Sequence, residues 1–148
     1  MAKIEIITAV QASRQKIWDF VSDPKQYPEW IHFVREVFGI TDFPLKKGAV
    51  YYERAKPGPV ETVSKWIVTE FDPPKRQVHI GEETAMSYRL TIELERLGEN
   101  MTQWRHTLEF RALPRFRPLG VVIEKLLHRK MHKELERVVG AGKDIIEQ

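Results

Sequence analysis

The chain has 148 residues and a formal net charge of +3, and 42% of its residues are hydrophobic and 30% charged. This length is common for one domain with its own core, so we expect a single domain spanning residues 1–148. No apolar run is long enough to cross a bilayer, and the absence of cysteine excludes disulfides and thiolate chemistry and favours a cytoplasmic location.

The first third of the chain predicts a strand followed by two short helices. Residues 3–10 alternate between polar and apolar side chains, which is the period of a half-buried strand. Ser13 is a helix-capping residue, and the apolar face after it predicts a helix over residues 14–22. A second helical turn is expected over residues 25–33, where three aromatic side chains share one side: Tyr27, Trp30 and Phe33.

Strand-like segments separated by turn signals follow as far as residue 112. They cover residues 34–41, 49–55, 62–71, 76–81, 86–97 and 101–112. The last two are joined by Gly98-Glu99-Asn100, which predicts a three-residue hairpin loop with Gly98 in a left-handed conformation. In 49–55 and 62–71 both faces carry large apolar residues, so the inward face of these two strands stays open.

The final hairpin has one apolar and one polar face. Its even positions are expected to face inward, namely Met86, Tyr88, Leu90, Ile92 and Leu94 on the first strand and Trp104, His106, Leu108 and Phe110 on the second. This alternation is typical of an antiparallel sheet that is covered on one face.

Residues 118–148 predict one long amphipathic helix. Steps of three or four residues place an apolar stripe on one face: Leu119, Ile123, Leu127, Met131, Leu135, Val138, Gly142 and Ile145. Gly142 on this stripe is explained either by the close approach of a strand or by space left for a ligand. The expected class is α+β, with helices on one face of an antiparallel sheet. Because a twisted sheet cannot follow a straight helix along its whole length, an apolar space should lie between them.

The order of these segments resembles that of a known superfamily. The likeness is carried by residues 10–24, Tyr27-Pro28-Glu29-Trp30, Lys47-Gly48, Asp72-Pro73-Pro74-Lys75-Arg76 and Pro118-Leu119-Gly120. In this order they resemble the START-like or Bet v 1-like (SRPBCC) superfamily, and within it the polyketide cyclase/dehydrase branch. The resemblance implies a helix-grip fold, in which a curved seven-stranded antiparallel sheet wraps around a long C-terminal helix and encloses an apolar cavity. It does not fix the activity, because the superfamily includes lipid and hormone carriers, aromatase/cyclases, chaperone regulators and ribosome- or quinone-associated proteins.

Our first hypothesis is a carrier, not an enzyme, that binds a small hydrophobic molecule of lipid, polyketide or aromatic type without a cofactor. The side chains expected to contact this molecule are Trp30, Tyr88, Leu90, Trp104, His106, Leu108, Phe110, Leu127, Met131 and Leu135. The alternative is a cyclase/dehydrase-type enzyme in which His106 and Tyr88 act as acid, base or orienting groups. The simpler interpretation of His106 is a buried structural histidine, because no carboxylate at a recognisable spacing pairs with it.

A third hypothesis is a protein that interacts with a ribosome or a chaperone. A basic patch suited to anionic lipid or ribosomal RNA is expected from Arg115, Arg117, Lys125, Arg129, Lys130 and Lys133, and its simpler interpretation is a solvated face. No DNA partner is expected. His128 and His132 have a spacing that can hold zinc, but both fall on the charged helix face without a catalytic glutamate between them, so we expect no metal site.

Overall fold

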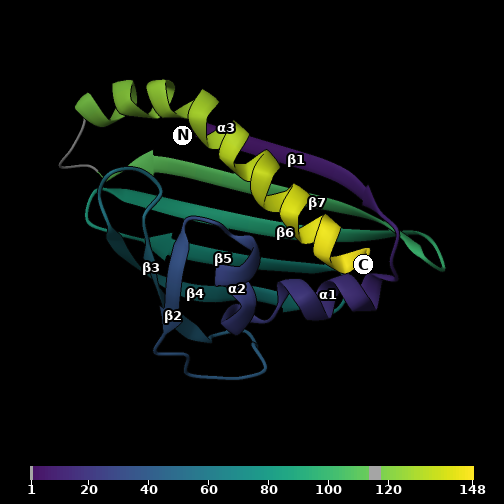
Figure 1. The fold of residues 1–148 in the computed structure, drawn as a ribbon. Helices are drawn as coiled ribbons and strands as arrows, with labels where there is room; N and C mark the ends of the chain where they lie inside the picture. Colours follow the sequence, from purple (N-terminus) through teal and green to yellow (C-terminus); the bar gives the residue numbers. More distant parts are fainter. Residues whose placement is uncertain (1, 114–117) are drawn as a thin grey trace.

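A seven-stranded antiparallel sheet curves around a long C-terminal helix in the computed structural model, which describes residues 2–113 and 118–148 (Figure 1). The strand order is β1-β7-β6-β5-β4-β3-β2, so β1 (Ala2–Val10) and β2 (Val34–Phe38) form the two edges. Between them lie β3 (Val50–Ala55), β4 (Thr62–Asp72), β5 (Arg76–Glu82), β6 (Met86–Gly98) and β7 (Met101–Ala112). This is the expected α+β helix-grip fold.

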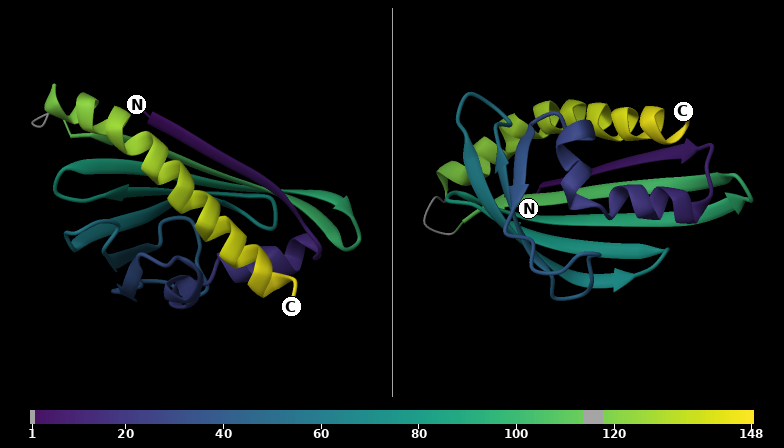
Figure 2. Two further views of the ribbon diagram at one scale, coloured as in Figure 1. Left: turned by 45° about the horizontal axis from the view of Figure 1, so that its top comes forward. Right: turned by 60° about the horizontal axis from the view of Figure 1, so that its bottom comes forward.

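Three short helical segments connect the two edge strands: α1 (Arg14–Val21), the 3-10 turn η1 (Pro24–Gln26) and α2 (Tyr27–Trp30). Ser13 caps α1 as expected, because its hydroxyl oxygen accepts a hydrogen bond from the backbone N–H of Lys16 at 3.2 Å. The long helix α3 (Leu119–Ile146) crosses the concave side of the sheet over β1 and β7, and its C-terminal half lies beside α1 and α2 (Figure 2).

The inward face of β3 and β4, which the sequence left open, is settled by burial and register. On β3 the buried side chains are Tyr51, Glu53 and Ala55, and on β4 they are Ser64, Trp66 and Val68. Tyr51 pairs with Trp66 across the two strands, and Glu53 pairs with Ser64. A carboxylate therefore points to the same side of the sheet as the aromatic residues.

The β6–β7 hairpin has the expected inward face but a different turn. The even positions Ile92, Leu94, Trp104, His106, Leu108 and Phe110 are all buried. Gly98 belongs to β6 and pairs with Met101 after a shift of register, and the glycines with positive φ among the described residues are Gly39 and Gly48. The prediction of a left-handed Gly98 was wrong because a bulge in β6 takes up the extra residue.

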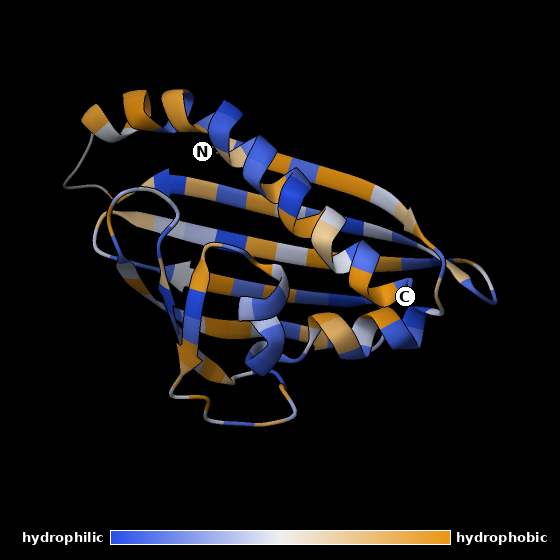
Figure 3. Cartoon of the chain, viewed as in Figure 1, coloured by the Kyte–Doolittle hydropathy of each residue, from blue (hydrophilic) through white to orange (hydrophobic). Residues whose placement is uncertain are grey.

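The apolar stripe of α3 is buried only in the second half of the helix. There Leu135, Val138, Val139, Gly142 and Ile146 pack against the sheet. In the first half the stripe was predicted wrongly, since Leu119 is 66% exposed, Ile123 37% and the neighbouring Leu126 74%. Figure 3 shows the reason, because the apolar first turns of α3 reach beyond the sheet.

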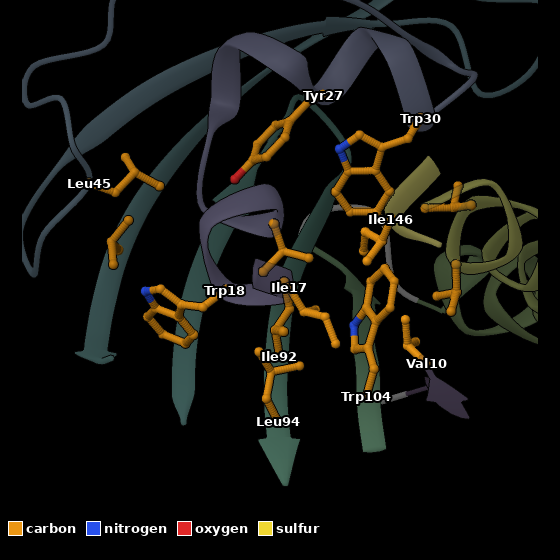
Figure 4. Close-up of a cluster of buried hydrophobic side chains, with 14 of the residues drawn as sticks. Val10, Ile17, Trp18, Tyr27, Trp30, Leu45, Ile92, Leu94, Trp104 and Ile146 are labelled. Carbon is orange, nitrogen blue, oxygen red and sulfur yellow. The ribbon is translucent and has the colours of Figure 1, made fainter. Parts of the chain in front are cut away.

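Trp30 of α2 and Trp104 of β7 join the second half of α3 to the core. Their ring centroids lie 5.8 Å apart, and Ile146 packs beside them (Figure 4). A Cβ atom added to Gly142 would lie 2.9 Å from the ring of Trp104 and 3.1 Å from that of Trp30. Close approach therefore explains Gly142, and space for a ligand does not.

Candidate functional site

An apolar cavity of about 100 Å³ lies between α3 and the concave face of the sheet. One water needs roughly 10–15 Å³ on the same measure, so the cavity has room for several waters or for a small organic molecule. Its walls come from the α1–β2 region, from β3, β4, β6 and β7, from the β5–β6 turn and from α3.

The cavity brings together seven of the ten side chains that the sequence suggested for ligand contact: Trp30, Tyr88, Leu90, His106, Leu108, Met131 and Leu135. The other three do not line it. Trp104 is fully buried beneath Trp30 and Gly142, Phe110 belongs to a separate apolar cluster near β1, and Leu127 is half-buried one helical turn before Met131. Even positions of β7 share a face, but the helix packs tightly over some of them and stands away from others.

One end of the cavity is closed and the other is open. The closed end is formed by fully buried side chains, among them Val21 and Val138. At the other end the lining residues are only partly buried: Phe33, Pro57, Thr62, Glu83 and Met131. The opening therefore lies between the β3–β4 loop, the β5–β6 turn and the middle of α3.

Aromatic rings make up one wall of the cavity. The rings of Tyr51 and Trp66 are nearly parallel at 6.3 Å between centroids, and Trp66 in turn stacks on Tyr88 at 5.9 Å. Gly81 on β5 makes this stack feasible, because a Cβ atom there would lie 2.5 Å from the Trp66 ring. Tyr27 meets Tyr51 edge to face at 5.9 Å, which extends the aromatic wall to α2.

A buried chain of hydrogen bonds fixes the orientation of Tyr51. His79 Nε2 lies 2.7 Å from Gln77 Oε1, which can only accept, so Nε2 carries the proton and donates it. Burial lowers the pKa of His79 to about 3, so the ring is neutral and Nδ1 accepts the hydroxyl proton of Tyr51 at 2.7 Å. Gln77 Nε2 donates onward to the hydroxyl of Ser22 at 2.9 Å. The sequence analysis missed this chain.

Glu53 is the most unusual group in the cavity, and the sequence analysis missed it as well. Its side chain is inward and 8% exposed, and it forms no hydrogen bond or ion pair with any residue that the structure describes. Burial raises the pKa of its carboxyl group to about 7, because the charged form loses its hydration. It lies two residues from Tyr51 and two from Ala55 on the buried face of β3, a face that the sequence had left open.

His106 and Trp30 also present polar atoms without partners. Within the described part of the chain, His106 Nδ1 and Trp30 Nε1 are buried and have no hydrogen-bond partner. Burial lowers the pKa of His106 to about 4, so this ring is neutral at physiological pH. Both side chains line the cavity, but these two nitrogens have almost no accessible surface, so they face the surrounding protein and not the cavity itself. The tyrosines remain protonated, because burial raises the pKa of Tyr88 and of Tyr51 well above the ordinary value.

The two histidines of the possible zinc spacing have separate partners. His128 Nε2 lies 3.0 Å from the carbonyl oxygen of Lys3, and His132 Nδ1 pairs with Glu136 at 2.7 Å. Among residues 2–113 and 118–148, no three metal-ligating side chains gather into a group. Of the basic patch, Lys125, Arg129, Lys130 and Lys133 are exposed on α3, whereas Arg115 and Arg117 lie outside the described residues.

Comparisons with known proteins agree with this geometry. A family model described as polyketide cyclase / dehydrase and lipid transport matches residues 1–141. A START superfamily protein from Mycobacterium smegmatis is 18% identical with a TM-score of 0.78, covering 100% of this chain and 99% of its own. The comparison with curated proteins gave no match.

Two further solved structures have the same fold. A protein from Thermus thermophilus is 15% identical with a TM-score of 0.75 over 97% of this chain and 96% of its own. The Zhui aromatase/cyclase from Streptomyces sp. R1128 is 15% identical with a TM-score of 0.73 over 95% and 93%. At these identities the structural likeness establishes the fold alone. In the described part of the chain, no helix has the length and apolar character needed to span a membrane.

Proposed function

Because the chain belongs to the polyketide cyclase / dehydrase and lipid transport family, we propose that it binds and carries a small, mainly apolar molecule in the cavity beneath α3. The observation that supports this most directly is the combination of an apolar cavity with one inward carboxyl group on its wall, that of Glu53, which has no partner among the described residues. A guest that is apolar over most of its surface, with a polar group at one point, would satisfy both features.

Native mass spectrometry of protein purified from its own host tests the proposal. We expect an added mass that is released by denaturation and is absent from a variant whose cavity is filled. Met131→Trp places a larger side chain at the opening, and Leu97→Trp is the matched control because Leu97 is 54% exposed near the end of β6 and does not line the cavity. A reproducibly empty wild-type protein, together with no binding of the neutral apolar dye N-phenyl-1-naphthylamine, would contradict the proposal.

We further propose that the first half of α3 docks on the surface of an anionic lipid bilayer. Its exposed face carries a cluster of apolar side chains, Leu119, Val122, Ile123 and Leu126. A cluster of basic side chains lies beside them, namely Lys125, Arg129, Lys130 and Lys133. Glu124, the one carboxylate of this segment, is buried and accepts the backbone N–H of Ala112 at 2.7 Å. Apolar side chains beside cations suit a bilayer better than ribosomal RNA, because RNA offers phosphates but little apolar surface.

The docking surface borders the opening of the cavity. Pro57 and Met131 line the opening, and the neighbouring Gly58 lies close to the ammonium group of Lys130. Val60 at the tip of the same β3–β4 loop is 68% exposed. A bilayer in contact with this end would face the opening directly, which suits the exchange of an apolar molecule between membrane and cavity.

Co-sedimentation with vesicles tests the docking surface. We expect binding to phosphatidylserine-containing vesicles at low salt, with weaker binding to pure phosphatidylcholine and release by salt. Leu126→Glu and Lys130→Glu should each reduce binding several-fold, and Lys65→Glu on the outer face of β4 should not. Sedimentation with ribosomes but not with vesicles would overturn this assignment.

A further inference from the structure

The cavity is lined by an unusual number of aromatic side chains. Six rings border it: Tyr27, Trp30, Phe33, Tyr51, Trp66 and Tyr88. All of them except Phe33 are held in place by ring contacts with one another, and Tyr51 is additionally fixed by its hydrogen bond to His79. Aromatic faces carry partial negative charge, so a set of rigid rings attracts cations, ammonium groups in particular.

The side chains of the same lining that can carry a full charge at neutral pH are acidic. Its carboxylates are Glu53 and Glu83, and no lysine or arginine occurs among the described residues that line it. Glu83 at the opening also receives the backbone N–H of Ala85 at 3.3 Å, whereas Glu53 has no partner within the described chain. A buried carboxylate without a partner is costly unless an ion or hydrogen-bond donor meets it, so the wall lacks one positive group.

From this arrangement we infer that the molecule carried in the cavity bears an amine or ammonium group, which meets Glu53 and the aromatic rings, on an apolar body that fills the rest. The inference rests on the proposed carrier function and names the class of its ligand. The apolar body would lie against the aliphatic wall of Leu90, Leu108 and Leu135. A carboxylate or phosphate at this end of a ligand would be repelled by Glu53 and would find no cationic partner.

Binding of an amine should depend on pH through Glu53. The titratable side chains that line the cavity with it are Tyr27, Tyr51, Tyr88, His106 and Glu83. The tyrosines stay protonated and His106 stays neutral across the range from pH 5.5 to 8, because burial raises the pKa of the phenols and lowers that of the imidazole to about 4. Apolar residues of α3, Met131 and Leu135, face the same space. The ionisation of Glu53 therefore controls the charge of the buried wall in this range.

Three probes of nearly equal shape test which charge the cavity prefers. They are the cation 2-phenylethylamine, the neutral 2-phenylethanol and the anion 3-phenylpropanoate. Binding is measured by isothermal titration calorimetry and by tryptophan fluorescence, since Trp30 and Trp66 line the cavity. At pH 8 we expect the amine to bind at least ten-fold more tightly than the alcohol, and the carboxylate to bind most weakly. At pH 5.5 the advantage of the amine should shrink to a few-fold, because Glu53 is then protonated.

Glu53→Gln keeps the shape of the side chain and removes its charge, so the preference for the amine at pH 8 should disappear. Glu61→Gln is the matched control, because Glu61 is exposed on the adjoining loop and pairs with Arg54. Equal binding of amine and alcohol, or a preference for the amine that survives in Glu53→Gln, would overturn the inference and leave the carrier function standing. If none of the three probes nor N-phenyl-1-naphthylamine binds, the carrier function fails and the inference with it.

Discussion

Glu53 is a carboxyl group in an apolar wall, and its ionisation has an energetic cost for the folded protein. Its pKa rises from 4.5 in an unfolded chain to about 7 in the fold. The folded state therefore binds this proton more tightly than the unfolded state does, and stability is greatest below pH 4.5 and falls as the pH rises towards 7. This difference in pKa corresponds to a loss of folding stability of at most roughly 3 kcal/mol. A strand would avoid this cost with glutamine or leucine, so the carboxylate is better explained by binding than by folding.

Glu53→Gln should stabilise the empty protein mainly at high pH. At pH 8 the variant avoids the buried charge, so its free energy of unfolding should exceed that of wild type by about 1–3 kcal/mol. At pH 5 the folded wild-type side chain is neutral and only the unfolded one has begun to ionise, so the difference should fall to about 1 kcal/mol or less. Urea unfolding followed by circular dichroism at both pH values measures the two differences. The same difference at pH 5 and pH 8 would refute the proposed cause.

At the scale of residues, the sequence predicted the wall where burial alternates cleanly and missed it elsewhere. The even positions of the last hairpin placed Tyr88, Leu90, His106 and Leu108 correctly in the cavity wall. Glu53 and His79 were missed, because a charged or polar residue on a strand normally indicates the solvent face. Their burial depends on partners far along the chain, such as Tyr51 for His79, and no local pattern encodes such pairing.

At the scale of elements, the two halves of α3 behave differently. The second half packs on the sheet through Trp30 and Trp104, and the first half reaches past it with an exposed apolar face. Hydrophobic periodicity predicted the length of the helix correctly: the predicted helix covers residues 118–148, and the observed helix covers Leu119–Ile146. It could not show which part of the stripe meets a partner, because periodicity reports that a face is apolar and not what covers it.

Two glycines of α3 provide a matched test of this packing. A Cβ atom at Gly142 would come within 2.9 Å of Trp104, whereas one at Gly140 meets nothing within 4 Å. Gly140→Ala should raise the free energy of unfolding by about 0.5–1 kcal/mol through helix propensity. Gly142→Ala gains the same propensity but forces the two tryptophan rings apart, so we expect a net loss of about 1–3 kcal/mol. Thermal and urea unfolding of both variants measure this, and equal stabilisation by both would contradict the close packing.

At the scale of the whole molecule, the fold encloses two neutral histidines near one cavity and carries a group of exposed cations on the first half of α3. His79 and His106 are buried and uncharged, and Lys130 of the basic patch lies close to Gly58 beside the opening. The fold class and the presence of an apolar space were predictable from the order of segments. The size of the cavity, its open end and its charge were not, because they depend on how closely a curved sheet and a straight helix approach at each turn.

The two neutral histidines should make the whole fold sensitive to acid. The pKa of His79 falls from 6.5 to about 3 and that of His106 to about 4, so the unfolded chain takes up protons first as the pH falls. Their contribution to stability is complete above pH 6.5 and is lost progressively below it. Between pH 6.5 and 4.5 the two histidines take up two protons on unfolding and Glu53 releases one, so these three groups together lower the stability by about 1.4 kcal/mol per pH unit.

Replacing one histidine separates its contribution to the pH dependence of stability from that of the surface carboxylates. In His106→Gln the free energy of unfolding, measured by urea titration at several pH values, should vary less steeply between pH 6.5 and 4.5, by about 1.4 kcal/mol per pH unit. Glu53→Gln should change the slope by a similar amount in the opposite direction, because the opposing proton is removed. Identical slopes for wild type and His106→Gln would contradict the lowered pKa of the buried His106.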